Sequence, residues 1–204
     1  MSHQNEYHNT DQHLVSRSVG GDRHAFGIII KNTERLVTQL IFKMIPVPAD
    51  RKDLAQDVFM KVYKNLPGFK FQSRLLTWVG QITYNTCLNY LDKKKVVLID
   101  VRDDDDDNQQ QLLDRLQQRD IARYDNEVER LLSAKELSVI LNAGMDKLPP
   151  VYKTLLSLYH QEELSYAEIS EITNLPEGTV KSYLFRARKA LKKNLLTNYK
   201  REDL

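Results

Sequence analysis

The chain has 204 residues, a formal net charge of +2, and 41% hydrophobic against 28% charged residues. This length suits one ordinary domain or two small ones, and the apolar content excludes a wholly disordered chain. The single cysteine, Cys87, excludes an internal disulfide and a cysteine-rich zinc site. The first twelve residues lack a signal-peptide pattern, and the most apolar stretch, 36–45, is too short and too polar to span a bilayer. We therefore expect a cytoplasmic protein.

The charges fall into three blocks of alternating sign. Residues 1–99 carry 14 Lys and Arg against 8 Asp and Glu, residues 100–146 carry 6 against 13, and residues 147–204 carry 10 against 7. This order is typical of two modules that contact a polyanion, joined by a segment that avoids one. Solvated helix surfaces joined by an acidic linker would give the same pattern.

Helical periodicity and sparse glycine and proline predict an all-α protein. The N-terminal residues 1–21 are expected to form a tail and a short helix, marked by Leu14, Val15 and Val19, that ends at Gly20. Asp22 is placed to cap a second helix running to Pro46. Its predicted core stripe is Phe26, Ile29, Ile30, Val37, Leu40, Ile41 and Met44.

A third helix is expected after Asp50, which we predict to be its cap. Leu54, Val58 and Val62 recur at four-residue spacing and should be buried. Pro67-Gly68 ends this helix, and a loop over 69–73 leads into a long helix from about 74 to 95, which completes a first domain over 22–95. Leu75, Val79, Ile82, Thr86 and Leu91 can line its buried side, and Trp78 follows the same apolar stripe.

An acidic segment separates this domain from a second one. Residues 96–132 include five consecutive aspartates and are too polar to offset the entropy of ordering, so we interpret them as a flexible linker. Ser133 and Glu136 have the spacing of a capping box, and helices are expected up to Leu148 and again from Pro149-Pro150. The second domain is expected over 133–195, followed by a tail over 196–204.

The end of the chain has the pattern of a helix-turn-helix. Ser165 and Glu168 form a second capping box, the helix is expected to end near Asn174, and another helix starts at about Pro176. Residues 162–177 contain five acids and no base, whereas residues 178–201 contain eight bases and no acid. The second helix therefore has the charge of a DNA-binding helix.

Five residues of this helix lie off its core stripe of Val180, Leu184, Ala187 and Leu191, and can face a major groove: Lys181, Ser182, Phe185, Arg186 and Lys189. A helical hairpin with a basic surface is the alternative.

Two sets of motifs resemble one family. Leu148-Pro-Pro, Leu164-Ser-Tyr-Ala-Glu-Ile169 and Pro176-Glu-Gly-Thr-Val180 followed by Arg186-Ala-Arg-Lys-Ala-Leu191 resemble the promoter-reading C-terminal region of extracytoplasmic-function (ECF) sigma factors. Asp53-Leu-Ala-Gln-Asp-Val-Phe59, Tyr63-Lys-Asn-Leu66, Thr77-Trp78 and Asn85 resemble the other conserved domain of that family. The chain is thus identified as similar to a transcription initiation factor.

The resemblance implies three groups of binding residues. The helix around Asp53, Gln56, Asp57 and Lys61 would dock on a coiled coil of the largest subunit of core RNA polymerase. A second group would melt promoter DNA and capture a base of the minus-ten element: Phe69, Phe71, Gln72, Ser73 and Asn85. The third group would read the minus-thirty-five element and consists of Thr179, Lys181, Ser182, Tyr183, Phe185, Arg186 and Lys189.

The resemblance also implies an anti-sigma partner, of a type that can be tethered to a membrane. The sequence contains no Gly-rich phosphate loop, metal-ligand cluster or recognisable nucleophile motif, so we expect no cofactor, no small-molecule substrate and no enzymatic reaction. The chain departs from the family pattern at Gly80-Gln81, where Tyr-Arg is frequent, and at Tyr183, where a basic residue is common. Gly80 is expected to soften its helix, and Gln81 to remove a phosphate contact.

Two other classes of function fit the same residues. A stand-alone helix-turn-helix regulator would bind its operator tightly without polymerase. A helical adaptor protein would show no salt-dependent affinity for DNA.

Overall fold

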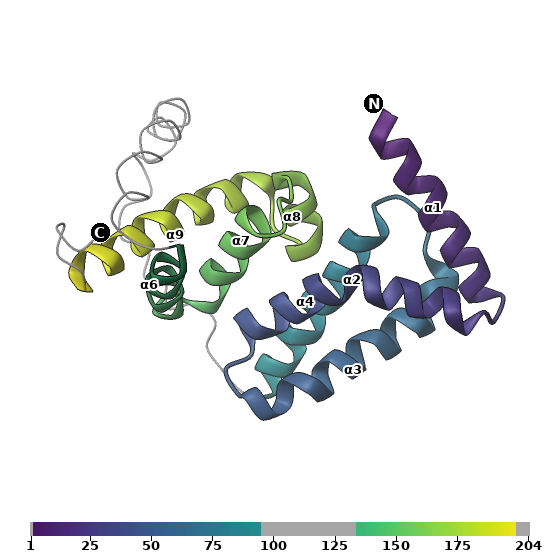
Figure 1. The fold of residues 1–204 in the computed structure, drawn as a ribbon, viewed down its shortest axis with the longest axis horizontal. Coiled ribbons are helices and arrows are strands. Elements are labelled where there is room, and N and C mark those ends of the chain that lie inside the picture. The colour runs from purple at the N-terminus through teal and green to yellow at the C-terminus, as the bar shows by residue number, and fades with distance from the viewer. Residues whose placement is uncertain (1, 95–133, 199–204) are drawn as a thin grey trace. The chain divides into compact units, whose positions relative to one another are not determined.

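All regular structure in the described part of the chain is helical. The computed structural model describes residues 2–94 and 134–198, and within these ranges it contains helices and no strand (Figure 1). The prediction of an all-α protein is confirmed. The predicted linker over 96–132, the box residue Ser133 and the last residues of the C-terminal tail lie outside the described residues.

The helices divide between two compact units. The first unit contains α1 (Ser2–Val19), α2 (Arg23–Met44), α3 (Pro48–Asn65), the short 3-10 helix η1 (Leu66–Gly68) and α4 (Leu75–Lys93), together with Ser157–Glu177. That last segment holds the end of α7 (Pro150–His160) and all of α8 (Tyr166–Thr173). The second unit contains α6 (Ala134–Asp146), the start of α7 and almost all of α9 (Glu177–Asn198). The domain boundaries at 95 and 133 stay predictions.

The start of α2 follows the predicted capping pattern. The Asp22 side chain accepts hydrogen bonds from the backbone N–H groups of His24 and Ala25, at 2.9 and 3.1 Å. The preceding α1 ends before Gly21, whose φ of +93° turns the chain back. The first helix begins at Ser2, so it is longer than the short helix that we expected.

The start of α3 differs from our prediction. The helix begins at Pro48, with Val47 at the N-cap position, so Asp50 lies in the first turn and is not the cap. Proline suits the first helical position because its missing N–H has no partner there in any case. Asp50 instead accepts a hydrogen bond from the Tyr90 hydroxyl of α4 and pairs with Lys94 at 3.9 Å.

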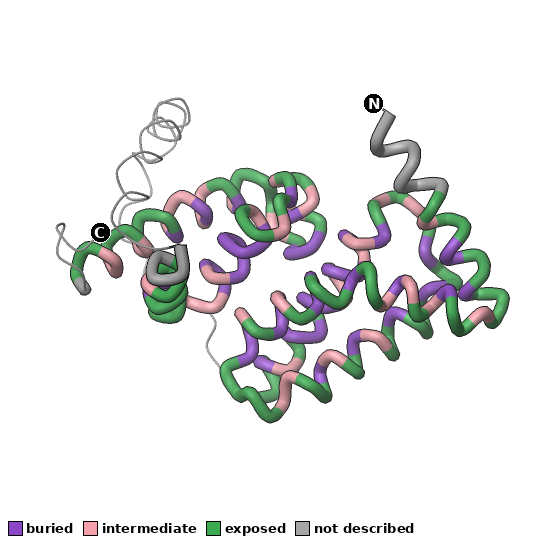
Figure 2. The backbone as a smooth tube through the Cα atoms, viewed as in Figure 1, coloured by how far each residue is buried: buried purple, intermediate pink, exposed green. Residues whose placement is uncertain are grey.

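Three helices supply most of the core of the first unit. Figure 2 shows buried stretches along the facing sides of α2, α3 and α4. The predicted four-residue stripe of α3 is fully or nearly buried, as are most predicted core residues of α2. Phe26 and Ile30 are only half-buried at the edge of that stripe.

The helix-turn-helix segment has the predicted local structure. The Ser165 hydroxyl accepts from the Glu168 N–H at 3.2 Å, and Glu168 accepts from the Ser165 N–H at 2.9 Å, which completes the capping box. Asn174 ends α8 in the left-handed conformation, at φ 55° and ψ 30°. Val180, Leu184 and Ala187 of α9 are fully buried, whereas Leu191 is only half-buried.

Candidate nucleic-acid and polymerase interfaces

Three packed aromatic rings support the loop before α4. The centroid of the Phe69 ring lies 4.7 Å from that of Phe71 and 4.9 Å from that of Trp78. Phe69 is 8% exposed, whereas Phe71 and Trp78 are half-buried. Ring pairs at these offsets add to the stabilisation from apolar burial. Phe69 is therefore the centre of the cluster, and the other two rings form its accessible edge.

The loop carries an unusual backbone conformation next to this cluster. Phe71 has a φ of +55°, in the left-handed region that costs a side-chain-bearing residue roughly 1–2 kcal/mol. Gln72, the next residue, is exposed, and Ser73 is half-buried. A bulky residue held in this conformation is typical of functional loops.

The outer face of α4 continues from the aromatic cluster without any charge. Trp78, Gln81 and Asn85 follow one another at helical spacing, and Asn89 lies one turn further on. Asn85 and Asn89 are exposed, and no residue from 75 to 91 carries a charge. An amide side chain can both donate and accept, as the edge of an unpaired base requires. Gln81 and Asn89 thus lie on the same face of α4 as the predicted Asn85. Their four-residue spacing in the sequence is enough to indicate that they share this face.

The opposite face of α4 packs against α8. A Cβ atom on Gly80 would lie 2.9 Å from Cδ1 of Ile172 and 3.1 Å from Cδ2 of Leu36. Both distances are shorter than normal carbon contacts, so a side chain at position 80 would require the Ile172 and Leu36 side chains to shift. Gly80 is thus a buried position in the packing of α4 against α8, in addition to its expected softening of the helix.

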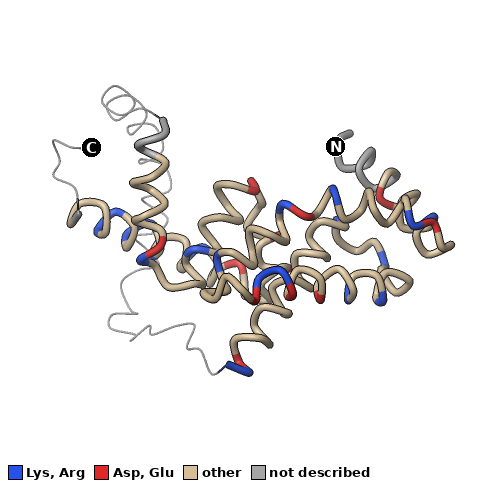
Figure 3. The backbone as a smooth tube through the Cα atoms, turned by 60° about the horizontal axis from the view of Figure 1, so that its bottom comes forward, with Lys and Arg blue, Asp and Glu red and all other residues tan. Residues whose placement is uncertain are grey.

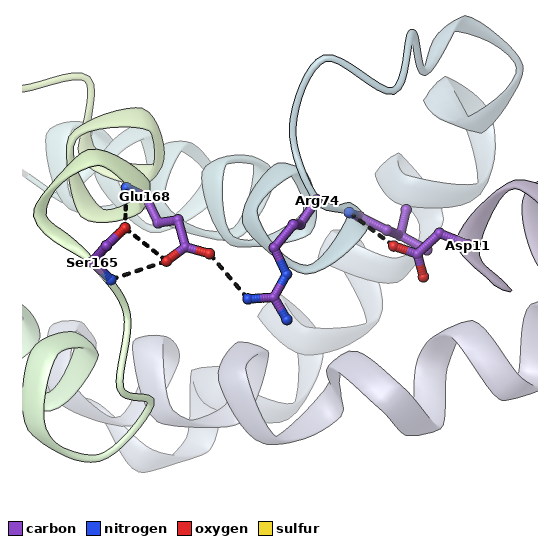
Figure 4. Close-up of polar contacts among 5 residues, drawn as sticks. Asp11, Arg74, Ser165 and Glu168 are labelled. Atoms are coloured by element: carbon purple, nitrogen blue, oxygen red, sulfur yellow. Dashed lines mark hydrogen bonds and ion pairs between the residues drawn. The ribbon is translucent and has the colours of Figure 1, made fainter. Parts of the chain in front are cut away.

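Charged side chains bracket the start of α4. Arg74 donates to Oε1 of Glu168 at 3.1 Å, and Oδ2 of Asp11 in α1 accepts from the Leu75 N–H at 3.3 Å (Figure 4). The N-cap residue Arg74 makes no side-chain cap of its own, so Asp11 supplies an acceptor from a distant helix. The sequence analysis did not predict these contacts of Arg74 and Asp11. No local sequence pattern marks a capping residue that lies 64 residues away.

The Glu168 carboxyl has a lowered pKa. Burial acts in the raising direction and is the largest single cause, but hydrogen bonds from Ser165 and Arg74 together with the Arg74 charge outweigh it. The carboxylate therefore stays ionised at neutral pH. It caps the start of α8 through Ser165 and pairs with Arg74 at the start of α4.

The predicted polymerase-binding residues lie on the outer side of α3. Asp53, Gln56 and Asp57 are exposed, and the same helix buries Leu54, Val58 and Val62 on its other side. Two large exposed side chains, Met60 at 55% and Tyr63 at 50%, lie on the same helix. The outer side of α3 thus combines carboxylates with apolar groups.

Lys61, the fourth predicted residue of this group, leans toward α4. Its ammonium group donates to Oγ1 of Thr86 at 3.1 Å, and that hydroxyl donates to the Ile82 carbonyl at 2.7 Å. Docking of a partner through Lys61 would exchange this internal hydrogen bond for an external one.

The side of α9 away from its buried stripe is basic. Ser182, Arg186 and Lys189 are spaced by four and three residues and share the outward side, with Thr179 one turn before them. Lys181 and Lys189 are exposed, and the predicted Thr179, Ser182, Phe185 and Arg186 are half-buried. Figure 3 shows Lys and Arg recurring along this helix.

Tyr183 has a packing partner within the second unit. Its ring lies edge-to-face on Tyr152 of α7, with centroids 5.9 Å apart. The tyrosine that replaces a common basic residue therefore braces α9 against α7. Its hydroxyl-bearing ring is half-buried, which reduces the surface that Tyr183 can present to DNA.

The described residues provide neither a metal-ligand cluster nor a membrane-spanning helix. Within residues 10–94 and 138–197, whose side chains the structure describes, no cluster of His, Cys, Asp or Glu could hold a metal ion. Within the same ranges, no helix has the length and apolar content needed to cross a membrane.

Comparison with known proteins gives consistent matches over both halves of the chain. The family described as "Sigma-70 region 2" matches residues 29–96, and that described as "Sigma-70, region 4" matches residues 138–191. The "ECF RNA polymerase sigma-E factor" of Escherichia coli K12 is 31% identical over 182 residues, which cover 89% of this chain and 92% of that protein.

Two solved structures have a similar fold. CnrH, solved with the cytosolic domain of CnrY, superposes with a TM-score of 0.62 at 17% identity, over 93% of this chain and 99% of its own. The sigma factor RpoE, solved with the anti-sigma factor NepR from Bartonella quintana, gives a TM-score of 0.57 at 18% identity, over 85% and 98%.

Proposed function

The chain belongs to the ECF RNA polymerase sigma factors of the sigma-70 family, and on this premise we propose how its residues divide the work of transcription initiation. The protein is a transcription initiation factor that binds core RNA polymerase and directs it to promoters. The loop at 69–73 and the outer face of α4 open and read the minus-ten element, and the outward side of α9 reads the minus-thirty-five element.

The observation that carries this proposal is the contrast between two candidate reading surfaces. A base captured from an opened duplex needs ring stacking and hydrogen bonds to its edge, and α4 offers aromatic rings beside uncharged amides. Duplex DNA needs cations and a helix that fits its major groove, and α9 offers a basic outward side. One chain with both surfaces is equipped to open DNA at one element while it binds intact duplex at another.

Polymerase docking is assigned to α3. Asp53, Gln56 and Asp57 are exposed on the side of that helix away from the core, where a partner helix can reach them. Met60 adds an exposed apolar contact on the same side. Lys61 contributes less to polymerase docking than these residues, because its ammonium group already donates a hydrogen bond to Thr86.

Further parts of the proposal concern location and partners. The protein acts in the cytoplasm, where polymerase and promoter DNA are found, and it acts by binding and not by catalysing a reaction. Because CnrH and RpoE were both solved with a bound partner, we also propose an anti-sigma partner for this chain.

A two-variant binding assay tests the function. Asp53→Ala with Asp57→Ala should weaken binding to purified core polymerase at least tenfold, whereas Asp92→Ala, an exposed acid at the end of α4, should not. Tight promoter binding by the free wild-type chain, with no affinity for polymerase, would favour a stand-alone regulator. Affinity for neither DNA nor polymerase would favour an adaptor.

A further inference from the structure

The loop at 69–73 is held at both of its ends by α1. Before the loop, α1 contacts η1, in which the buried Leu66 accepts from the Phe69 N–H at 3.1 Å. After the loop, Oδ2 of Asp11 in α1 accepts from the N–H of Leu75, the first residue of α4, at 3.3 Å (Figure 4). Residues 70–74 span the distance between these two attachments.

Asp11 lies on the side of α1 that faces the core. It is half-buried and precedes the buried residues Leu14, Val15 and Ser18 by three, four and seven positions. This spacing places all four residues on one face of the helix. The face that packs α1 onto the first unit therefore also brings the Asp11 carboxylate to the start of α4.

The other end of α1 is fixed to the start of α2. Arg17 donates from Nε and Nη2 to Oδ2 of Asp22, at 2.9 and 2.6 Å. Oδ1 of Asp22 caps α2 by accepting from the backbone N–H groups of His24 and Ala25. Because one continuous helix joins these two attachment points, the position of Asp11 is set by α2 and not by the loop.

The start of α4 depends on the Asp11 carboxylate. The N-cap residue of α4, Arg74, makes no side-chain cap, and the first turn of the helix contains no acid. A helix N-terminus leaves backbone N–H groups without partners and carries a partial positive charge. Asp11 supplies both an acceptor and the negative charge that α4 itself lacks there. Without this carboxylate, the first turn of α4 should fray.

Fraying of this turn would disturb the aromatic cluster beside the loop. The Trp78 N–H donates to the Arg74 carbonyl at 3.0 Å, so the position of the Trp78 ring depends on the first turn. Trp78 packs on Phe69, which in turn packs on Phe71. Phe71 has a φ of +55°, a conformation that a bulky residue keeps only where its surroundings impose it. The loop conformation therefore relies on the attachment at Asp11.

We propose that Asp11 is a positioning residue for promoter opening, which holds the start of α4 so that the loop at 69–73 keeps the conformation that captures an unpaired base. This inference rests on the proposed function of the loop. Asp11 acts through Leu75 and the aromatic cluster and not by contact with DNA. Its loss should affect the minus-ten element and leave polymerase docking by α3 and duplex binding by α9 intact.

Fluorescence of the free chain tests the structural part of this proposal. Trp78 is the single tryptophan of the sequence, so its emission reports on the aromatic cluster. Asp11→Ala should raise acrylamide quenching of Trp78 at least twofold, with a circular dichroism spectrum close to that of the wild type. Asp11→Asn keeps a neutral acceptor and should restore wild-type quenching. Gln12→Ala, an exposed neighbour on α1, is the matched control. Equal quenching of Asp11→Ala and the wild type would overturn the proposal.

Complexes with core polymerase test the functional part. Asp11→Ala should weaken binding of a single-stranded minus-ten oligonucleotide and slow promoter opening, read by permanganate, each about tenfold, and Asp11→Asn should recover both. Affinity for polymerase, and for a duplex that carries only the minus-thirty-five element, should stay unchanged. Loss of polymerase binding, or equal losses on both DNAs, would show that Asp11 supports the whole fold and would overturn the positioning role. A wild-type complex that neither binds the oligonucleotide nor opens promoters would overturn the proposed function instead, whereas the quenching result would stand.

Discussion

The two candidate reading elements, α4 with its loop and α9, are both helical but differ in their chemistry. From Leu75 to Leu91, α4 has no charged residue, and its outer face carries amides beside aromatic rings. In contrast, α9 carries six basic residues after a single acid in its first turn. Under the proposed function, duplex binding should depend on α9 and on salt concentration, whereas capture of an opened strand should depend on α4 and on shape.

The largest expected effect separates support from reading within the aromatic cluster. Phe69→Ala removes a nearly buried ring and should lower the free energy of unfolding of the first unit by about 3–4 kcal/mol. Chemical denaturation followed by circular dichroism measures this change. Phe71→Ala is the matched control, because its half-buried ring should cost clearly less stability. Equal losses would remove the distinction between a supporting ring and an accessible one.

Substitution of Arg186 tests the basic side of α9. Arg186→Ala should weaken promoter binding by the polymerase complex by about 2 kcal/mol, roughly thirtyfold, if it contacts a base edge. Competition binding on promoters with intact and scrambled minus-thirty-five elements measures the effect, which the scrambled promoter should not show. Arg188→Ala, an exposed arginine outside the Ser182–Lys189 side, is the control. Loss of polymerase binding in either variant would contradict the assignment.

Substitution of Asn85 tests the uncharged face of α4. Asn85→Ala should slow promoter opening about fivefold, equivalent to about 1 kcal/mol, because one neutral hydrogen bond is lost. Permanganate reactivity of unpaired thymines follows opening, and closed-complex affinity should stay unchanged over a range of salt. An equal loss in both measurements would place Asn85 in duplex binding and break the comparison with α9.

The smallest effect concerns the buried side of α4. Burial raises the pKa of the Cys87 thiol to about 12, while the nearby Lys61 charge acts in the lowering direction. The folded chain then keeps the proton that the unfolded chain loses above its ordinary pKa near 9, so stability falls as pH rises from 9 toward 12. At pH 9.5 the loss should be about 0.8 kcal/mol relative to pH 8. The variant Cys87→Ala should lack this component, and an identical pH profile would show that the thiol is already accessible in the fold.

Local patterns predicted much of this molecule because their causes are local. The Ser165–Glu168 capping box, the αL residue Asn174 and the four-residue stripe of α3 depend on neighbours a few positions away, and the structure has them as expected. The N-cap of α3 failed because Pro48 starts the helix two residues before Asp50. A proline at the first helical position outweighed a good capping residue that follows it.

Contacts between distant segments could not be predicted in the same way. The cap that Asp11 provides for α4 spans 64 residues in the sequence. The packing role of Gly80 follows only from the Ile172 side chain, which lies against it in the fold. In the sequence, Gly80 is simply a glycine within a helix. The DNA- and polymerase-binding residues were predicted through family motifs, and the structure adds which of them are exposed, which support others, and which, such as Lys61, already have a partner.

In vitro transcription tests the central claim most directly. Purified core polymerase from the source organism, with and without this chain, is supplied with a pool of genomic promoters, and start sites are mapped by sequencing. The account predicts new start sites that share two spaced upstream motifs, with Arg186→Ala weakening dependence on the upstream motif and Asn85→Ala weakening dependence on the downstream one. Binding of the chain to polymerase without any new start site, or no binding at all, would contradict it.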